Sequence, residues 1–256
     1  YEAYASTDLM GYANMTVGRM ALDYGSGALI GSNQFGSGAR NTQDGFIFDV
    51  ANDMLDLSVG YASANAGTEL ENSGTNMLVN ASKADGDWSI NLLYLSLKGT
   101  IDGVDLDDAT AMGIDLGYSM MGGSLDLSVS MNTANDGTDD YDMTSFGATY
   151  NVNDNMSVSA SQTTYGENGF GLDGTNMGDG GSEAGGSWMS HGNIGYLNAD
   201  DQDLSFGVNY DMGGISLGVT IHNISNNADL AEGVDEYERS ASEFSLGYSI
   251  NDNTSL

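Results

Sequence analysis

The stretch LSFGVNYDMGGISLGVTIH, residues 204–222, holds the pattern that decides the fold. Apolar residues alternate with small or polar residues on both sides of a Met-Gly-Gly sequence at 212–214. Because successive side chains of a β-strand point to opposite faces, each half has one apolar face and one polar face. The glycine pair is typical of a tight reversal. The stretch therefore predicts an antiparallel β-hairpin.

The same alternation recurs along the chain, and no segment sustains the 3.6-residue spacing of a helix. We treat residues 1–256 as a single domain. Tight turns rich in Gly, Asn and Asp alternate with longer polar loops at 63–74, 99–108, 133–140, 166–202 and 225–240. We predict about twelve strands, which lie at 12–23, 45–52, 54–65, 75–83, 88–98, 110–119, 124–132, 142–151, 155–165, 203–210, 215–224 and 241–250.

The composition excludes several classes of protein. The 256 residues include 37 Asp and Glu against 5 Lys and Arg, so the formal net charge is −32. Nucleic-acid binding is excluded because it needs clustered Lys and Arg. The absence of cysteine excludes disulfides and thiolate metal sites. The longest apolar runs have about four residues, whereas a transmembrane helix needs roughly 20. Because the chain begins with Tyr1, we expect a leader segment to precede it.

Strand length separates the two all-β architectures that share this alternation. Strands of soluble sandwiches average about five to six residues, but most of the predicted strands have about ten, which suffices to cross a bilayer when tilted. Alternating short turns and long loops are typical of outer-membrane proteins, whose sheets close so that every backbone group is paired. We therefore predict an all-β, antiparallel transmembrane β-barrel of the outer-membrane porin type with at least 12 strands. Residues 253–256 look like the start of another strand, which would make the chain part of a barrel of about 14–18 strands.

Large aromatic residues cluster near strand ends, where the aromatic girdles of membrane barrels lie. The predicted girdle residues are Tyr61, Trp88, Tyr94, Tyr118, Tyr150, Tyr165, Tyr210 and Tyr248.

The polar face of the strands carries carboxylates in mid-strand. Burying an unpaired charge in a dry core costs several kcal/mol, and five cations cannot pair all of these acids. This face is therefore expected to meet water, either as the lumen of a barrel or as the solvent face of a soluble sheet. The predicted pore-lining residues are Asp49, Asp56, Asn91, Asp115, Asp126, Ser128, Ser205, Asn209, Thr220, His222 and Glu243.

The loops suggest two further features. The longest loop, 166–202, either folds into the pore as a constriction or forms an external lid or mobile loop; its acids near a constriction would be Glu167, Asp173, Asp179 and Glu183. Two acidic loops offer oxygen ligands for Ca²⁺, through Asp102, Asp105 and Asp107 in one and Asp136, Asp139 and Asp140 in the other. Neither loop has the twelve-residue pattern that ends in Glu, which is typical of a specific Ca²⁺ loop. The alternative is that each is simply a solvated acidic loop. A middle case is non-specific bridging by divalent cations between these loops and anionic lipopolysaccharide.

The segment VGRMALDYGSGALIGS at 17–32, followed by Phe35, Arg40 and an Asp-Gly pair at 44–45, resembles the alginate-export family of outer-membrane β-barrels. The resemblance covers about residues 16–50. It implies a passive channel, a strand number larger than twelve, and lumenal or loop-packing roles for Arg19 and Arg40. An exporter of a polyanion should present a basic lumen, which this acidic chain does not offer. We therefore take the barrel architecture from this resemblance, and not the alginate substrate.

The most consistent function is a porin-like channel in the outer membrane of a Gram-negative bacterium, for passive diffusion of small hydrophilic solutes with a preference for cations. Its partners would be outer-membrane lipid, lipopolysaccharide and these solutes, in a homo-oligomer or a larger envelope complex. Catalysis is not expected, because His191 and His222 are the only histidines and form no recognisable nucleophile arrangement. Apart from Ca²⁺ in the acidic loops, no cofactor is expected. The alternatives are a structural or interaction barrel whose acidic loops bind divalent cations, lipopolysaccharide or a partner protein, and a soluble acidic secreted β-protein.

Overall fold

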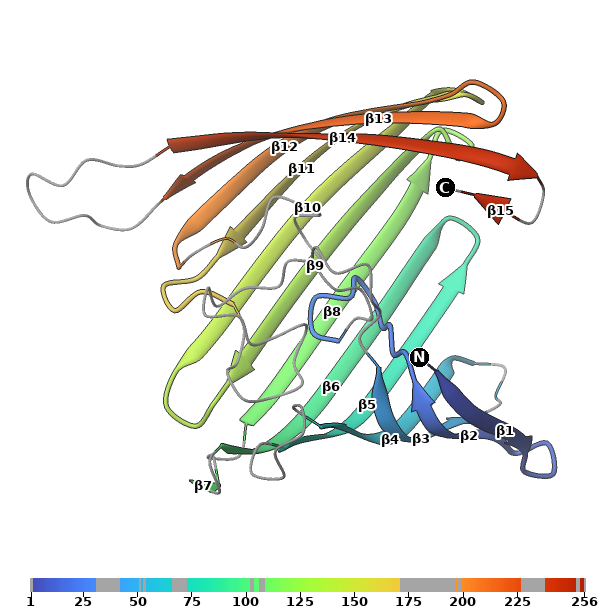
Figure 1. Cartoon of the computed structure of the whole chain (residues 1–256), viewed down its shortest axis with the longest axis vertical. Helices are drawn as coiled ribbons and strands as arrows, with labels where there is room; N and C mark the ends of the chain where they lie inside the picture. The colour runs from blue at the N-terminus through green and yellow to red at the C-terminus, as the bar shows by residue number, and fades with distance from the viewer. Residues whose placement is uncertain are drawn as a thin grey trace, which may run out of the picture.

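The computed structural model is an all-β protein in which the strands follow one another in chain order around a curved sheet (Figure 1). The structure describes residues 2–30, 42–50, 52, 54–65, 73–101, 104–105, 109–170, 197, 199–226, 238–251 and 254–255. The strands are β1 (Ala3–Asp8), β2 (Ala13–Met20), β3 (Gln43–Val50), β4 (Asp56–Asn65), β5 (Ser73–Asp85), β6 (Trp88–Ile101), β7 (Val104–Asp105), β8 (Ala109–Met120), β9 (Leu125–Asn135), β10 (Asp140–Asn153), β11 (Met156–Tyr165), β12 (Asp201–Asp211), β13 (Ile215–Asn226), β14 (Glu238–Asn251) and β15 (Thr254–Ser255).

Every pairing between strands is antiparallel, and each long strand pairs with its neighbours in sequence. The two-residue strand β7 pairs only with β6, which also pairs with β8. In the part of the chain that the structure describes, thirteen strands have six or more residues, so the prediction of at least 12 antiparallel strands is confirmed. Among the described residues, no pairing joins β1 to the β14–β15 end of the sheet. None of the described residues belongs to a helix long and apolar enough to cross a bilayer.

The two ends of the sheet differ in their connections. The hairpins β5–β6, β8–β9, β10–β11 and β12–β13 reverse within a few residues, and glycines with positive φ occupy three of these turns, including Gly86 at 60° and Gly213 at 73°. Because the order is antiparallel, all these tight turns lie at one end, which we call the turn end. The opposite ends of the strands, which the longer connections 21–42, 166–200 and 227–237 join in sequence, form what we call the loop end.

Several predicted boundaries were wrong. β1 was missed because its sequence, AYASTD, contains mainly small and polar residues. Half of the predicted loop at 133–140 is strand, since β9 extends to Asn135 and β10 begins at Asp140. The first predicted strand ends early, because the chain leaves the sheet after Met20.

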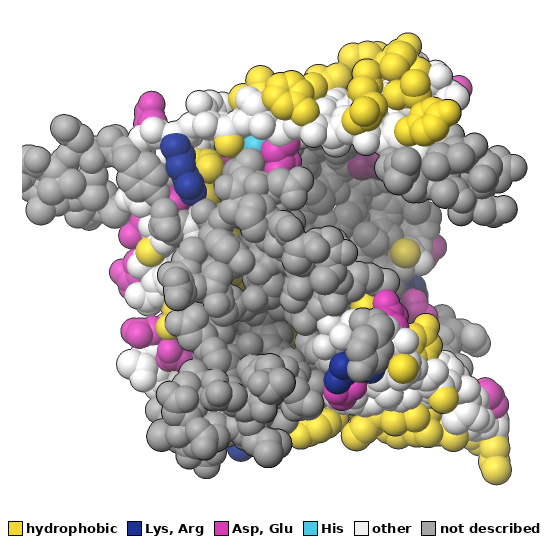
Figure 2. Space-filling model, in the orientation of Figure 1, with side chains coloured by type: hydrophobic (Ala, Val, Ile, Leu, Met, Phe, Trp, Pro, Cys, Tyr) yellow, Lys and Arg dark blue, Asp and Glu magenta, His cyan; other side chains and the backbone are white. Residues whose placement is uncertain are grey.

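The outer face of the curved sheet is apolar and exposed. Val59, Val79, Tyr94 and Met112 are direct neighbours on β4, β5, β6 and β8, and each is about 40 to 50% exposed. Figure 2 shows hydrophobic side chains along the upper edge, over β13 and β14, and along the lower edge, over β1 to β4. In a soluble sandwich such faces would pack together. An apolar band this wide is unusual on a soluble protein but matches the lipid-facing band of a membrane barrel.

Aromatic residues border this band. Trp88 and Tyr118 are cross-strand neighbours beside the tight turns. In the middle of β3 and β4, the rings of Phe46 and Tyr61 stack on the outer face with centroids 5.9 Å apart. Tyr165 departs from the predicted girdle. Its side chain turns to the inner face, where it is 2% exposed and packs against Phe170.

Candidate functional site

A band of polar residues crosses the inner face of the sheet obliquely, from the turn end of β4 to the loop end of β12. Each member is the direct cross-strand neighbour of the next, which places their β-carbons about 5 Å apart. From β4 to β12 the members are Asp56, Ser82, Asn91, Asp115, Ser130, Ser145, Thr163 and Asp203. We call this row the polar band.

Hydrogen bonds link neighbouring members of the polar band. The Ser130 hydroxyl donates to Oδ1 of Asp115 over 2.6 Å and accepts a bond of 2.8 Å from Nδ2 of Asn132. The hydroxyls of Ser145 and Thr163 lie 2.9 Å apart. Because these bonds fix the side chains against the wall, the band is an ordered surface of hydroxyl and carboxylate oxygens.

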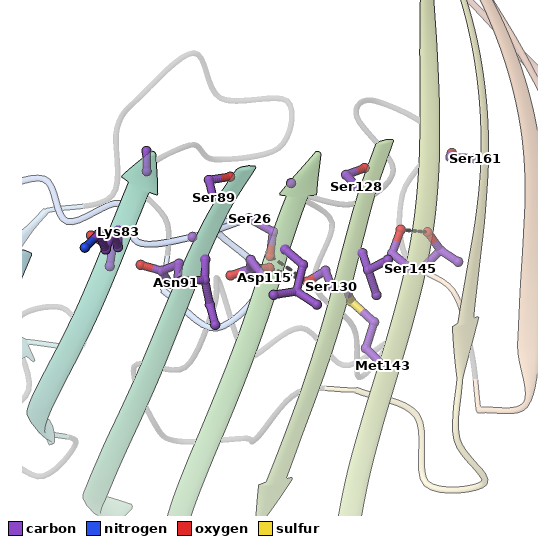
Figure 3. A pocket seen from close by; sticks show the side chains of 18 of the residues that line it. Ser26, Lys83, Ser89, Asn91, Asp115, Ser128, Ser130, Met143, Ser145 and Ser161 are labelled. Carbon is purple, nitrogen blue, oxygen red and sulfur yellow. Dashed lines mark hydrogen bonds between the residues drawn. The ribbon is translucent and has the colours of Figure 1, made fainter. Parts of the chain in front are cut away.

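A cavity of about 510 Å³ lies over this surface. Its lining includes Asp56, Asp115 and serines of five strands, among them Ser89 and Ser128. Figure 3 shows Asn91, Asp115, Ser130 and Ser145 on consecutive strands along its floor. Most residues that line the cavity therefore carry hydroxyl, amide or carboxylate groups, and Met143 adds an apolar side chain.

Residues 21–30 leave the end of β2 and cross the inner face; we call this segment the inner strap. Leu29 and Ile30 are 1% and 0% exposed, and they belong to one apolar cluster with Leu93 and Leu95 of β6. Near the loop end, therefore, the inner face is apolar and covered by the strap. The run of apolar residues at 92–95 was the sequence signal for this, because it breaks the alternation and places leucines on the inner face.

Polar contacts anchor the strap to the wall. The hydroxyls of Ser26 and Ser130 lie 2.9 Å apart, and Figure 3 shows Ser26 beside Asp115 and Ser130. Gly25 has a φ of 57°, and a β-carbon there would overlap Oδ2 of Asp115 and lie 2.7 Å from Nδ2 of Asn91. Only glycine fits this position, because it combines a left-handed backbone with close approach to the wall.

Tyr24 anchors the strap on the other side, against β3 and β4. Burial, reinforced by the negative charge of Asp49, raises the pKa of the Tyr24 phenol to about 12, although a hydrogen bond with Ser58 acts in the opposite direction. Ser58 also donates to Oδ1 of Asp49 over 2.6 Å. The strap thus spans the inner face from β3 to β9.

Of the described Lys and Arg residues, three lie on the outer face of the sheet and one on the inner face. Strand alternation places Arg19, Lys83 and Lys98 on the outer face, although Lys83 also borders the cavity. Arg19 forms a bidentate pair with Asp44 on the neighbouring strand, at 2.6 and 3.0 Å, which corrects the lumenal role implied for it. Arg40 lies outside the described residues. Among the described residues, Arg239 is the one Lys or Arg that alternation places on the inner face.

The inner face of β12, β13 and β14 carries a compact charged cluster. His222 donates from Nδ1 to Oδ2 of Asp203 over 2.7 Å, and its Nε2 lies 3.8 Å from Oε2 of Glu243. Nearby, Arg239 lies 3.7 Å from Asp201, which also accepts a bond of 2.9 Å from Asn226. Sequence reasoning missed this cluster because it depends on the register of three strands.

Strand alternation brings every predicted pore-lining residue to the inner face, but not to one site. Asp56, Asn91, Asp115 and Ser128 border the main cavity. Asn209 borders a separate cavity of about 310 Å³ at the turn end. The others lie along the wall on β3, β9 and β12 to β14: Asp49, Asp126, Ser205, Thr220, His222 and Glu243.

The predicted constriction residues are placed only in part. Glu167 is exposed in a turn where Gly166 bridges to Gly169. The other three, Asp173, Asp179 and Glu183, lie outside the described residues. The strap at 21–30, which falls in the stretch that carried the family resemblance, covers part of the inner face, and Phe170 and Leu197 of the long loop belong to the same buried apolar cluster.

The acidic loops do not converge on a metal position in the described part of the chain. Oδ1 of Asp136 accepts the backbone N–H groups of Thr138 and Asp139, and its Oδ2 accepts the Tyr141 hydroxyl. Burial acts to raise the pKa of Asp136, but these hydrogen bonds outweigh it and hold that pKa below its usual value. Asp140 accepts a bond from Asn135.

In the other acidic loop, Asp102 and Asp107 lie outside the described residues, and Asp105 belongs to β7. No group of three or more His, Asp and Glu side chains suited to a shared metal ion occurs among the residues described. The predicted Ca²⁺ sites are therefore not shown.

Comparison with known proteins identifies the architecture. No family model and no curated protein matches the sequence. The structure is similar to OpdO of Pseudomonas aeruginosa, with a TM-score of 0.70 and 16% identity over 98% of this chain and 70% of that one. OpdK of the same species, solved with vanillate, gives 0.68 and 15% over 96% and 68%. The outer membrane protein OprD gives 0.64 and 12% over 92% and 64%.

The chain thus has the fold of an OprD-type outer-membrane β-barrel, and it spans about two thirds of the length of these proteins. The predicted porin-like architecture is confirmed. The comparisons do not single out the alginate-export family, so the resemblance over residues 16–50 carries no more than the barrel architecture.

Proposed function

We propose that the chain forms a channel in the outer membrane of a Gram-negative bacterium, through which small hydrophilic solutes diffuse and cations pass preferentially. The observation that carries this proposal is the opposite character of the two faces. The outer face is an exposed apolar band, and the inner face holds the polar band and a cavity of about 510 Å³. Lipid would meet the first face and water the second.

Fixed charge on the wall supports the preference for cations. Asp49, Asp56, Asp115 and Asp126 lie on the inner face of β3, β4, β8 and β9, whereas Arg239, the one inner-face base described there besides His222, lies beside Asp201. Carboxylates along a narrow polar path attract cations and repel anions. The same charge disfavours a polyanion such as alginate, so we propose small cations and neutral solutes instead.

A measurement of ion selectivity tests the proposal. The purified chain is reconstituted into planar bilayers, and the reversal potential is recorded across a salt gradient. Cation preference is expected, and replacement of both cavity carboxylates (Asp56→Asn with Asp115→Asn) should reduce it. Asp85→Asn is the matched control, because Asp85 is exposed on the outer face at the turn end. Anion preference in the unmodified protein would refute the proposal.

One observation favours a second candidate, a structural or interaction barrel. The strap and the apolar cluster around Leu29 and Ile30 cover the inner face toward the loop end. If they seal the lumen, the acidic loops would carry the function, by binding divalent cations, lipopolysaccharide or a partner protein. Correctly inserted protein without conductance would support this candidate. A homo-oligomer or a larger envelope complex is a prediction for either function.

A further inference from the structure

We propose that His222 and Glu243 form a binding site for a divalent transition-metal ion of the Zn²⁺ class, with Asp203 orienting the histidine. The site lies on the inner wall where β12, β13 and β14 are adjacent, at the β12 end of the polar band, and its residues do not line the cavity that borders Asp56 and Asp115. It goes beyond the proposed channel function, since it needs neither conductance nor any particular solute.

The geometry of His222 is the first argument. Its Nδ1 is bonded to Oδ2 of Asp203, which leaves Nε2 as the free lone-pair position when the ring is neutral. Nε2 is buried and has no hydrogen-bond partner among the described residues. Metal-binding histidines typically donate their other ring nitrogen to a carboxylate in this way, which fixes the tautomer and raises ligand basicity. Asp203 and His222 are therefore arranged as an outer carboxylate and a ligand.

The second argument is the position of Glu243. Its Oε2 lies 3.8 Å from Nε2 of His222, too far for a hydrogen bond. A zinc ion lies about 2.0–2.1 Å from a histidine nitrogen and about 2.0–2.2 Å from a carboxylate oxygen, so one ion can bind both atoms at an open angle. The Glu243 side chain is 24% exposed, which leaves an approach for the ion and room for water to complete its coordination.

Local charge is the third argument. Among the described residues, the carboxylates of Asp203 and Glu243 lie on either side of the His222 ring, and the Asp203 side chain is 4% exposed. A buried carboxylate is costly unless its oxygens find partners, and Oδ1 of Asp203 is buried without a hydrogen-bond partner among the described residues. A divalent cation bound to His222 would lower that cost.

Isothermal titration of the full chain in detergent with ZnCl₂, after removal of metal with EDTA, tests the site. One Zn²⁺ per chain is expected, with Ca²⁺ binding at least tenfold more weakly because a histidine ligand disfavours it. His222→Gln and Glu243→Gln should each weaken Zn²⁺ binding at least tenfold, and Asp203→Asn should weaken it about 10- to 100-fold. Asp126→Asn, an inner-wall carboxylate on another strand, should leave the affinity unchanged.

The two histidines of the chain provide a matched pair for a spectroscopic readout. With Cu²⁺ as the probe, nitrogen hyperfine splitting in the electron paramagnetic resonance spectrum should persist in His191→Gln and disappear in His222→Gln. Circular dichroism shows whether each variant is folded. If His222→Gln is unfolded, Glu243→Gln tests the site instead, because Glu243 is partly exposed and its replacement disturbs the core less. Undiminished Zn²⁺ affinity in folded His222→Gln or Glu243→Gln would overturn the site. Conductance measured in EDTA tests the channel separately.

Discussion

Gly25 of the inner strap lies so close to Asp115 of β8 that any β-carbon at residue 25 would overlap the carboxylate. This contact joins the segment that follows β2 to β8, which is five strand pairings further along the sheet. The apolar cluster around Leu29 and the bond from Ser26 to Ser130 hold the same segment in place. The position of the strap, and with it the open area of the lumen, therefore depends on a residue without a side chain.

Replacing Gly25 with alanine should displace the strap from the wall. The new methyl group would collide with Asp115, and the φ of 57° adds a backbone cost of about 1–2 kcal/mol. We expect an altered single-channel conductance together with a lower unfolding temperature. Gly86→Ala is the control, since Gly86 has a φ of 60° but open space around its β-carbon position. Equal conductance in Gly25→Ala and Gly86→Ala would show that the contact with Asp115 does not set the channel width.

The Tyr24 anchor should fail at high pH. Its pKa is raised from 10.0 to about 12 in the folded chain, so folding favours the neutral phenol. That stabilisation is complete below about pH 10 and disappears as the pH rises through about 12; two pKa units correspond to about 2–3 kcal/mol. Denaturant unfolding at pH 9 and at pH 11.5 measures this loss.

Tyr24→Phe separates this residue from the other thirteen tyrosines of the chain. The variant cannot ionise at residue 24, so its stability should fall less between the two pH values than that of the unmodified protein. An identical fall in both proteins would mean that other groups account for the alkaline loss of stability.

The contrast between the walls and the strap explains how much the sequence could predict. Period-two alternation is a local property, so residues such as Leu217 and Thr220 already show which face each will occupy. Most strands and their tight turns could therefore be predicted, although the reversal at residues 9–12 was missed together with β1. The path of residues 21–30 depends on packing against β6 and β8, far along the chain, and local pattern carries no information about it. Tyr165 was assigned to a girdle because it stands at a strand end, although alternation places it on the same inner face as Ser161 and Thr163, where it packs against Phe170.

The candidate site, like the fold, could be predicted only where it follows from alternation within a strand. Alternation alone sufficed to bring Asp56, Asp115 and Glu243 to one face. The pairing of His222 with Asp203 could not be predicted, because it depends on the register between β12 and β13. A shift of one residue would turn His222 to the lipid side.

A pair of adjacent residues on β9 tests which face meets lipid. Val129 alternates onto the outer face beside Leu116 and Phe146, whereas Ser128 lies on the inner face at the cavity. Val129→Arg should destabilise the chain folded into lipid vesicles by about 2–4 kcal/mol if the residue lies near the bilayer midplane, because the guanidinium would enter hydrocarbon. Ser128→Arg introduces the same side chain one residue away into a hydrated space and should cost much less. Urea titration of vesicle-bound protein, followed by tryptophan fluorescence, measures both. If the two substitutions cost the same, or if Ser128→Arg costs more, the assignment of the apolar face to lipid is wrong.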